Sequence, residues 1–332
     1  MTTTLLDVRN LSKYFTITSG TFRRNAGMIK AVDNVSFSIG RSETLGLVGE
    51  SGCGKTTTGR LILRLIERTA GTMTFHHEGK AIDIASLQGE SLRRFRRHIQ
   101  LVFQDPFSSL NPRMTVFDIV AEPLRAHGCA SRGEIEARVE SLMRSVGLDP
   151  AYLRRYPHAF SGGQRQRVGI ARALALNPCL VVCDEPVSAL DVSVQAQILN
   201  LLKDLQEQLG LAYLFIAHDL SVVENISARV AVMYAGRIVE MAPTNDIFQD
   251  PRHPYTVALL QALPKPEPAR GKVRPVLPGE IADPGRLPAG CPFHPRCVHA
   301  NTCCRAEMPC LREYTPGHIV ACHRAGDNLF GT

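Results

Sequence analysis

The residues best suited to chemistry lie in three short segments of the chain. Residues 49–56 read Gly-Glu-Ser-Gly-Cys-Gly-Lys-Thr, a glycine, four residues and then Gly-Lys-Thr. Glycines let backbone N–H groups converge on an anion, while Lys55 would reach the β- and γ-phosphates and the Thr56 hydroxyl would bind Mg²⁺. The pattern predicts a phosphate-binding loop. The residues expected around the phosphates are Gly49, Ser51, Gly52, Cys53, Gly54, Lys55, Thr56 and Thr57.

Each of the other two segments is an apolar run that is followed by side chains able to titrate or to bind a metal ion. Residues 180–185 read Leu-Val-Val-Cys-Asp-Glu, which predicts a buried parallel strand with carboxylates at its carboxyl end, where α/β sheets bind ligands. Asp184 would hold Mg²⁺, and Glu185 would orient or activate an attacking water. A second apolar run, 211–217, ends in His218, which would contact a γ-phosphate. In isolation, a histidine at the end of a strand is more often a core residue, and a pair of acids is more often a helix cap. The phosphate loop upstream favours a nucleotide site instead.

The flanking elements must place these residues. A strand over 44–48 and a helix over 57–67 put the loop at a helix N-terminus, whose N–H groups and dipole attract anions. Leu61, Leu63, Leu65 and Ile66 are expected to face a core.

A second glycine-containing segment, Phe160-Ser161-Gly162-Gly163-Gln164, precedes a helix over 165–176, with Ser161 as N-cap. Phe15 or Tyr14 would stack on a base, although an isolated aromatic is more often core. Other expected elements are strands 5–8, 32–39, 73–75, 99–103, 230–234 and 237–239, helices 116–127, 132–146, 194–208, 246–249 and 254–262, and a polar loop 18–27.

Composition excludes several classes of protein. With 332 residues and 44% hydrophobic content the chain can bury a large core, but no apolar run approaches the roughly 18 residues of a membrane helix. Residues 1–4 lack the pattern of a secretion signal, so we expect a cytoplasmic protein. The net charge is +7, yet the basic cluster at 93–98 contains one aromatic, Phe95, and the chain has no Trp. Nucleic acid is therefore a weak hypothesis for the partner.

Cysteines and prolines mark the C-terminal part of the chain. Six of the ten cysteines lie between residues 291 and 332, and in a cytosolic chain such clustering suggests metal rather than disulfides. Seven prolines between 264 and 288 predict an extended linker. The expected domains are an ATP-binding domain at 1–263, with a helical part at about 107–176, a linker at 264–290 and a cysteine-rich region at 291–332.

In combination, these motifs resemble the ATP-binding subunits of ABC transporters over about residues 5–263. The phosphate loop, Gln104, 160–164, 180–185, 188–191 and His218 occur in the order of that family. Segments 104–113, 156–158, 185–194 and 251–256 resemble the oligopeptide/dipeptide importer subfamily, and within it the second of two non-identical ATPase subunits. The resemblance implies an α/β P-loop NTPase fold of ABC type with an antiparallel β subdomain, a helical signature subdomain and a small cysteine-rich C-terminal extension.

In that family two ATPase subunits close head to tail around two ATP. The resemblance implies that a partner's signature loop completes the site at Lys55, and that Ser161, Gly162 and Gly163 complete the partner's site. The further roles that it implies are base stacking for Phe15, contact with Mg²⁺ and water for Gln104, general base for Glu185, γ-phosphate sensing for His218, a place in the signature for Gln164 and a link across the dimer for Asp191.

The resemblance extends to the tail. Cys291, Cys297, Cys304 and Cys322 match the four-cysteine pattern with which the subfamily binds a [4Fe–4S] cluster. Cys303 is an alternative to Cys304, and Cys310 also departs from the pattern. A Cys₄ zinc site, or no metal, remains an alternative. A structural role is expected, because the tail has few apolar residues of its own.

The function that follows is an ATP-hydrolysing subunit that powers import of di- or oligopeptides from the cytoplasmic face of the membrane. Its expected partners are a homologous second ATPase, two transmembrane permease subunits and a substrate-binding protein. One alternative is an importer of another cargo, such as a nickel chelate or a modified peptide. A soluble ABC ATPase acting on ribosomes or DNA, and a redox-sensing iron–sulfur protein, are alternatives from other classes.

Overall fold

The computed structural model describes residues 4–19, 24–128, 131–263, 282–283 and 285–327. Contacts divide the chain into two compact units. Unit 1 comprises Met1–Leu5, Ile39–Thr44 and His76–Ile216, and unit 2 comprises Leu6–Ser38, Leu45–Phe75 and Ala217–Thr332. Most of the linker predicted at 264–290 lies outside the described residues.

Unit 1 is built on parallel strands. β6 (Ile99–Val102) pairs with β7 (Leu180–Asp184), and β7 pairs with β8 (Ala212–Ala217). Every residue of β7 and β8 is buried, as expected for strands covered on both faces. The predicted strand at 180–184 is therefore confirmed.

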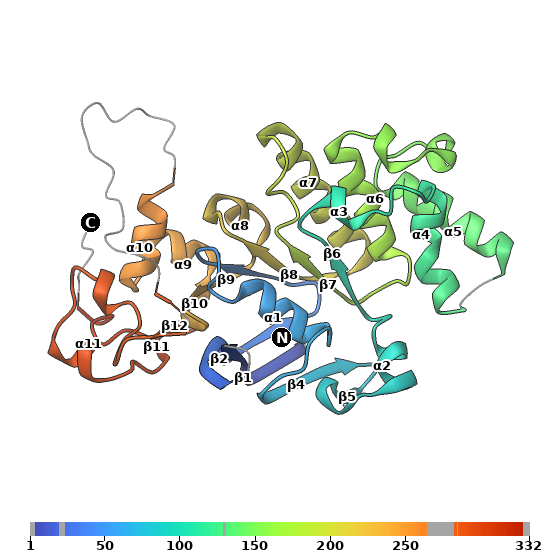
Figure 1. Cartoon of the computed structure of the whole chain (residues 1–332). Helices are drawn as coiled ribbons and strands as arrows, with labels where there is room; N and C mark the ends of the chain where they lie inside the picture. Colours follow the sequence, from blue (N-terminus) through green and yellow to red (C-terminus); the bar gives the residue numbers. More distant parts are fainter. Residues whose placement is uncertain (1–3, 20–23, 129–130, 264–281, 284, 328–332) are drawn as a thin grey trace. The chain divides into compact units, whose positions relative to one another are not determined.

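The helices of unit 1 begin where the sequence supplies caps. α4 (Val116–Ala126), α5 (Arg132–Ser145) and α6 (Gly162–Leu174) pack on one another, and Figure 1 shows them as a green group. Ser161 accepts a hydrogen bond from the Gln164 N–H, which confirms the predicted N-cap. The remaining α-helices and strands are β5 (Lys80–Asp83), α2 (Gly89–Phe95), α3 (Pro106–Ser109) and α7 (Val192–Leu209).

Unit 2 contains a mixed sheet in the order β11-β12-β10-β9-β3. β3 (Thr44–Val48) runs parallel to β9 (Arg229–Tyr234), and β10 (Arg237–Pro243) is antiparallel to both β9 and β12 (His318–Val320). The tail therefore contributes strands to this sheet, which its sequence did not predict. The other elements here are α1 (Lys55–Ile62), α8 (Leu220–Ile226), α9 (Thr244–Gln249), α10 (Pro254–Gln261), α11 (Thr302–Ala306) and β11 (Arg312–Thr315).

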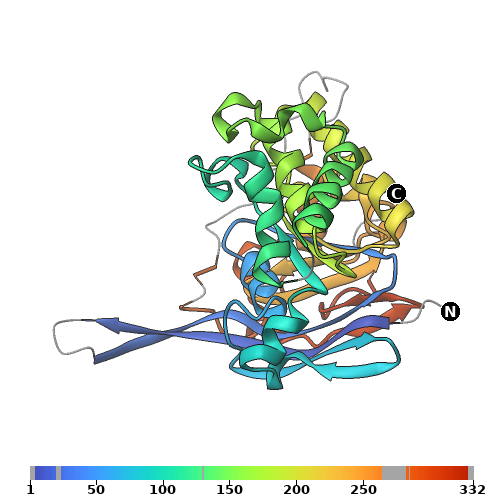
Figure 2. The same ribbon diagram turned by 90° about the vertical axis from the view of Figure 1, so that its right-hand side faces the viewer.

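A long two-stranded ribbon, β1 (Thr4–Ser19) and β2 (Arg24–Gly40), also belongs largely to unit 2. Figure 2 shows it as the dark blue pair of strands, and β1 pairs antiparallel with β4 (Ala70–His77). The loop predicted over 18–27 is wrong where it overlaps these strands. Backbone pairing satisfies the N–H and C=O groups there whatever the side-chain polarity, and residues 16–18 are β-branched, which suits a strand.

The helix after the phosphate loop is shorter than predicted. It ends at Ile62, and Arg64 follows with a left-handed backbone, φ 52°. Leu61 and Leu63 are buried as expected, but Leu65 lies beyond the helix and is 53% exposed, so its predicted core position is wrong. Across the described ranges, no helix has the length and apolar content needed to span a membrane.

Candidate functional site

The phosphate loop of unit 2 is a tight turn between β3 and α1. A Cβ on Gly49 would lie 2.2 Å from the Met233 carbonyl oxygen, so only glycine fits there. The Lys55 side chain is 4% exposed, and its ammonium donates to the carbonyl oxygens of Gly49 (2.7 Å) and Glu50 (2.9 Å). Helix α1 begins at Lys55 after Gly54, which is in the left-handed conformation. The loop is thus held in a compact form with a helix N-terminus behind it.

A hydrogen-bonded chain supports the loop from behind. The Gly236 N–H donates to the Cys53 carbonyl (2.9 Å), and the Asp33 N–H donates to the Gly236 carbonyl (2.8 Å). The Asp33 carboxylate in turn accepts two bonds from Arg237 (3.0 and 2.7 Å) and one from the Tyr14 hydroxyl (2.6 Å). Tyr14 is therefore committed to this network.

Phe15 differs from its neighbour Tyr14. Phe15 is 41% exposed, and the Lys13 ammonium lies 5.0 Å from the centroid of the Phe15 ring. Of the two aromatics that the sequence offered for base stacking, Phe15 is the accessible one.

Two residues from the C-terminal part of unit 2 hold Glu50, the second residue of the phosphate loop. The Tyr255 hydroxyl accepts a hydrogen bond from the Glu50 N–H at 2.8 Å. Arg296 makes a bidentate ion pair with the Glu50 carboxylate, at 2.8 and 3.0 Å, and its side chain is 5% exposed. The Glu50 hydrogen bonds raise the pKa of Arg296. Sequence reasoning missed both contacts, since no local pattern signals them.

In unit 1 the structure brings Gln104 and Glu185 together. The Gln104 Nε2 donates to the Glu185 Oε2 at 3.1 Å. Glu185 follows β7 with a left-handed backbone, φ 46°, and its N–H donates to the Ile216 carbonyl at 2.9 Å. A non-glycine residue in this conformation is strained, and such strain concentrates at functional sites. Asp184, 9% exposed, ends β7 beside it.

Hydrogen bonds hold residues 160–164 of unit 1, the segment proposed as the signature. Ser161 and Gln164 cap α6 reciprocally, and the Arg165 guanidinium donates to the carbonyls of Pro157 (2.8 Å) and Phe160 (2.9 Å). Asp191 caps α7 by accepting a hydrogen bond from the Val194 N–H at 3.0 Å. His218 directly follows β8, is exposed and belongs to unit 2.

Four of the tail cysteines converge on one pocket of unit 2. Cys291, Cys297, Cys304 and Cys322 line it together with His294, His299 and His323. Burial raises the pKa of the Cys291 and Cys322 thiols to about 11. A backbone hydrogen bond from Cys291 to Cys304 (2.8 Å) closes the segment. Cys303 and Cys310 are not among the residues that line this pocket.

Comparison with known proteins assigns the family. Residues 32–188 match a family model described as ABC transporter, and residues 239–304 match one described as oligopeptide/dipeptide transporter, C-terminal region. The oligopeptide transport ATP-binding protein AppF of Bacillus subtilis strain 168 is 52% identical over 324 residues, which cover 96% of this chain and 97% of that protein. The chain belongs to the ATP-binding proteins of peptide ABC transporters.

Further matches agree with this ABC ATPase assignment. A protein described as a peptide import ATP-binding protein of Brucella ovis is 51% identical over 327 residues, covering 98% of this chain and 99% of that protein. The dimeric, post-hydrolysis ATP-binding cassette MJ0796, solved with ADP and Pi, superposes with a TM-score of 0.63 at 29% identity over 72% of this chain and 99% of that one. The predicted ABC-type fold is thereby confirmed.

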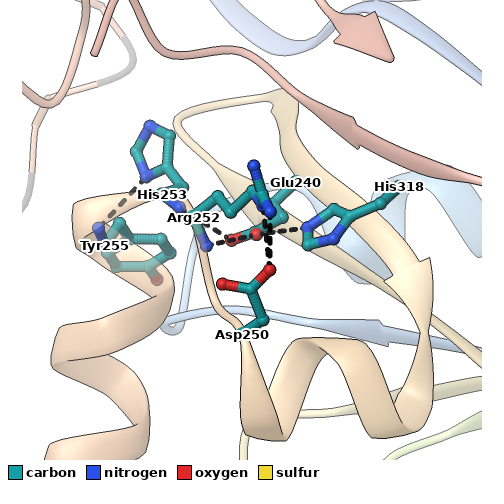
Figure 3. Close-up of polar contacts among 6 residues, drawn as sticks. All are labelled: Glu240, Asp250, Arg252, His253, Tyr255 and His318. Atoms are coloured by element: carbon teal, nitrogen blue, oxygen red, sulfur yellow. Dashed lines mark hydrogen bonds and ion pairs between the residues drawn. The ribbon is translucent and has the colours of Figure 1, made fainter. Parts of the chain in front are cut away.

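In this ABC ATPase a buried carboxylate ties the tail to β10. Glu240, 0% exposed, accepts hydrogen bonds from the backbone N–H groups of Arg252 (2.7 Å) and His253 (3.1 Å), and its Oε1 lies 2.8 Å from the His318 Nε2. Figure 3 shows these groups converging on Glu240. His318 begins β12, so strand pairing and a buried polar contact together fix the tail hairpin.

Proposed function

We propose that this chain hydrolyses ATP to power the import of di- or oligopeptides across the cytoplasmic membrane. The observation that carries the proposal is the hydrogen bond between Gln104 and Glu185, with Glu185 in a strained conformation at the end of a buried strand. Glu185 would be the general base that takes a proton from the attacking water, and Gln104 would position that water.

The groups that would hold the nucleotide suit their proposed roles. Thr56, Gln104 and Asp184 offer a hydroxyl, an amide oxygen and a carboxylate, the oxygen ligands that Mg²⁺ prefers. Because Gln104 donates through Nε2, it has its amide oxygen left for a cation. Lys55 would turn from the loop carbonyls to the β- and γ-phosphates, and bound Mg²⁺ would offset the charge of the transferring phosphoryl group. His218 would sense the γ-phosphate and the exposed Phe15 would stack on the base.

A second, homologous ATPase subunit would complete each ATP site. The capped N-terminus of α6, with Gly162 and Gly163 in its first turn, would present backbone N–H groups to the nucleotide of the partner. Asp191, at the start of α7, would link the two subunits.

The permease subunits would bind unit 1 near Gln104. Phe103 and Phe107 are 45% and 57% exposed on either side of it, and exposed aromatic residues mark protein interfaces. These contacts would hold the chain at the cytoplasmic face of the membrane, and a substrate-binding protein would select the cargo.

The four-cysteine pocket would hold a [4Fe–4S] cluster. Four thiolates are what such a cluster needs, and Cys304 rather than Cys303 lines the pocket. Cluster binding would stabilise the tail, and zinc is the alternative.

The test of the transport function is reconstitution with the proposed permease subunits and second ATPase subunit. We expect the tagged chain to copurify with them from gently solubilised membranes, and peptide uptake into vesicles to require ATP. ATP hydrolysis by a chain that copurifies with ribosomes alone would overturn the transport proposal and leave the ATPase assignment intact.

The test of the cluster is iron analysis of two neighbouring variants prepared without oxygen. Cys304→Ser should lose most of the iron, and Cys303→Ser should keep about four irons per chain. Equal iron in both variants, or zinc in place of iron in the unmodified protein, would contradict the assignment.

A further inference from the structure

Two histidines and a cysteine meet in unit 1, at the opposite ends of the strands from Gln104 and Glu185. His98 directly precedes β6, which leads to Gln104, and Cys179 directly precedes β7, which leads to Glu185. His77 ends β4. None of the three has a place in the proposed hydrolytic machinery.

The ligand atoms of this trio are close enough to share one metal ion. One nitrogen of each histidine and the Cys179 sulfur all lie within 4.8 Å of one another. The His77 Nδ1 lies 3.5 Å from the Cys179 Sγ, and the two imidazole rings are 4.3 Å apart with an interplanar angle of 46°. Tetrahedral zinc bonds of about 2.3 Å to sulfur and about 2.0 Å to nitrogen give a sulfur–nitrogen separation of about 3.5 Å. The observed separation agrees with that value.

The backbone fixes two of the three ligands before any metal binds. The His98 carbonyl accepts hydrogen bonds from the N–H groups of Cys179 (2.9 Å) and Leu180 (3.1 Å). The Cys179 carbonyl accepts from the Ala212 N–H at 2.9 Å, and the His98 N–H donates to the Phe95 carbonyl at 2.9 Å. Ligands held on paired strands lose little freedom on metal binding, which makes a site precise.

We propose that His77, His98 and Cys179 bind one zinc ion that joins the end of β4 to the starts of β6 and β7. Imidazole and thiolate together suit a borderline-soft divalent cation rather than Mg²⁺. Water would supply the fourth ligand, and Glu78, whose Oε1 lies 3.7 Å from the His77 Nε2, would face the imidazole nitrogen that does not bind the metal. Binding replaces the thiol proton of Cys179 with the metal and releases that proton to solvent. The site stabilises unit 1 and takes no part in ATP hydrolysis.

The first test counts zinc in the full-length protein after incubation with micromolar Zn²⁺ and gel filtration. Because the proposed site at the tail cysteines would also bind metal, the comparison is between variants that all keep Cys291, Cys297, Cys304 and Cys322. We expect Cys179→Ser and His98→Asn to bind one zinc fewer than the unmodified protein. The matched control is Cys310→Ser, which removes an exposed cysteine outside both groups and should bind the same number of zinc ions as the unmodified protein.

Thermal unfolding gives a second readout. Added Zn²⁺ should raise the Tm of the unmodified protein and of Cys310→Ser more than that of Cys179→Ser or His98→Asn, while basal ATP hydrolysis stays the same in Cys179→Ser. Equal zinc content and equal Tm shifts in all four proteins would overturn the proposal and leave a sulfur–imidazole hydrogen bond as the only role of the trio.

Discussion

Arg296 and Glu50 are 246 residues apart in the chain, and two hydrogen bonds of 2.8 and 3.0 Å join them. Glu50 is the second residue of the phosphate loop, and Arg296 immediately precedes Cys297, which lines the four-cysteine pocket. The Arg296 side chain is almost wholly buried, so this ion pair is shielded from water. Through it, the C-terminal part of unit 2 constrains the conformation of the nucleotide-binding loop.

Replacing Arg296 with Ala should therefore affect both stability and ATP binding. It removes two charge-assisted hydrogen bonds and leaves the Glu50 carboxylate partly buried, at a cost on the order of 2 kcal/mol in the free energy of unfolding. A less constrained loop should raise the Kd for ATP about fivefold, roughly 1 kcal/mol. Urea unfolding and fluorescent-nucleotide titration would measure both. Arg312→Ala, an exposed arginine of β11, is the control and should change neither.

The same contact predicts that loss of iron weakens nucleotide binding. If the proposed cluster holds Cys297 in place, its removal frees the turn that carries Arg296. Anaerobic chelation of the unmodified protein should then raise the Kd for ATP by about the same fivefold factor as Arg296→Ala. Chelation should add nothing to the Kd of Arg296→Ala itself. An additive effect in that variant would show that the cluster acts on the loop by another route.

Glu185→Gln is expected to separate ATP binding from ATP hydrolysis. The amide keeps the size of the side chain and its contact with Gln104, but it cannot accept a proton from water. Turnover of the assembled transporter should fall by roughly 10²–10⁴-fold while the Kd for ATP stays near that of the unmodified protein. Single-turnover hydrolysis and equilibrium binding measure the two quantities. A near-normal rate would show that another group is the base.

The sequence predicted the parts of the site that local pattern determines. The glycine spacing of the phosphate loop, the apolar run before Asp184 and the N-cap at Ser161 each depend on a few adjacent residues, and the structure contains the strand and helix starts expected from them. These features follow from backbone geometry and burial, which short segments encode.

Contacts between distant segments were not predictable in this way. Arg296 with Glu50, His318 with Glu240, and His77 with Cys179 each join positions whose neighbours in sequence carry no signal of the pairing. The short strands β11 and β12 were missed for the same reason, since their stability comes from pairing with each other and with β10 rather than from residue preference. The loop predicted at 18–27 is wrong at residues 18–19 and 24–27, because polar side chains do not prevent backbone pairing of β1 with β2.

Acid should weaken the support behind the phosphate loop. Burial alone would raise the pKa of the Asp33 carboxyl, but its hydrogen bonds with Tyr14 and Arg237 outweigh burial and lower that pKa. The carboxylate therefore stabilises the folded state above the unfolded pKa of about 3.9, and this stabilisation is lost as the pH falls below it.

The corresponding experiment compares the unmodified protein with Asp33→Asn by urea unfolding at about pH 7, 5 and 3.5. The variant should be less stable at neutral pH. The gap should shrink toward pH 3.5, because the carboxyl of the unfolded chain gains a proton there while the native carboxyl, whose pKa is lowered, keeps its charge. Asp204→Asn, at an exposed position in α7, should show no gap at any pH. A gap of constant size would mean that the ionised form of Asp33 contributes nothing.

Two glycines of helix α6 should respond in opposite ways to the same substitution. A Cβ on Gly163 would lie 2.5 Å from the Cγ1 of Val194 at the start of α7, whereas a Cβ on Gly169 would meet no atom within 4 Å. Gly163→Ala should lower the free energy of unfolding by about 1–3 kcal/mol through overpacking. Gly169→Ala should raise it by about 0.5–1 kcal/mol, because alanine favours a helix interior. Thermal unfolding of the two variants would measure the difference. The ATPase rate of the assembled transporter should fall only in Gly163→Ala, because there residues 160–164, the proposed signature, must move away from α7. Equal Tm shifts of the same sign would mean that Val194 gives way without cost and that Gly163 is not required by packing.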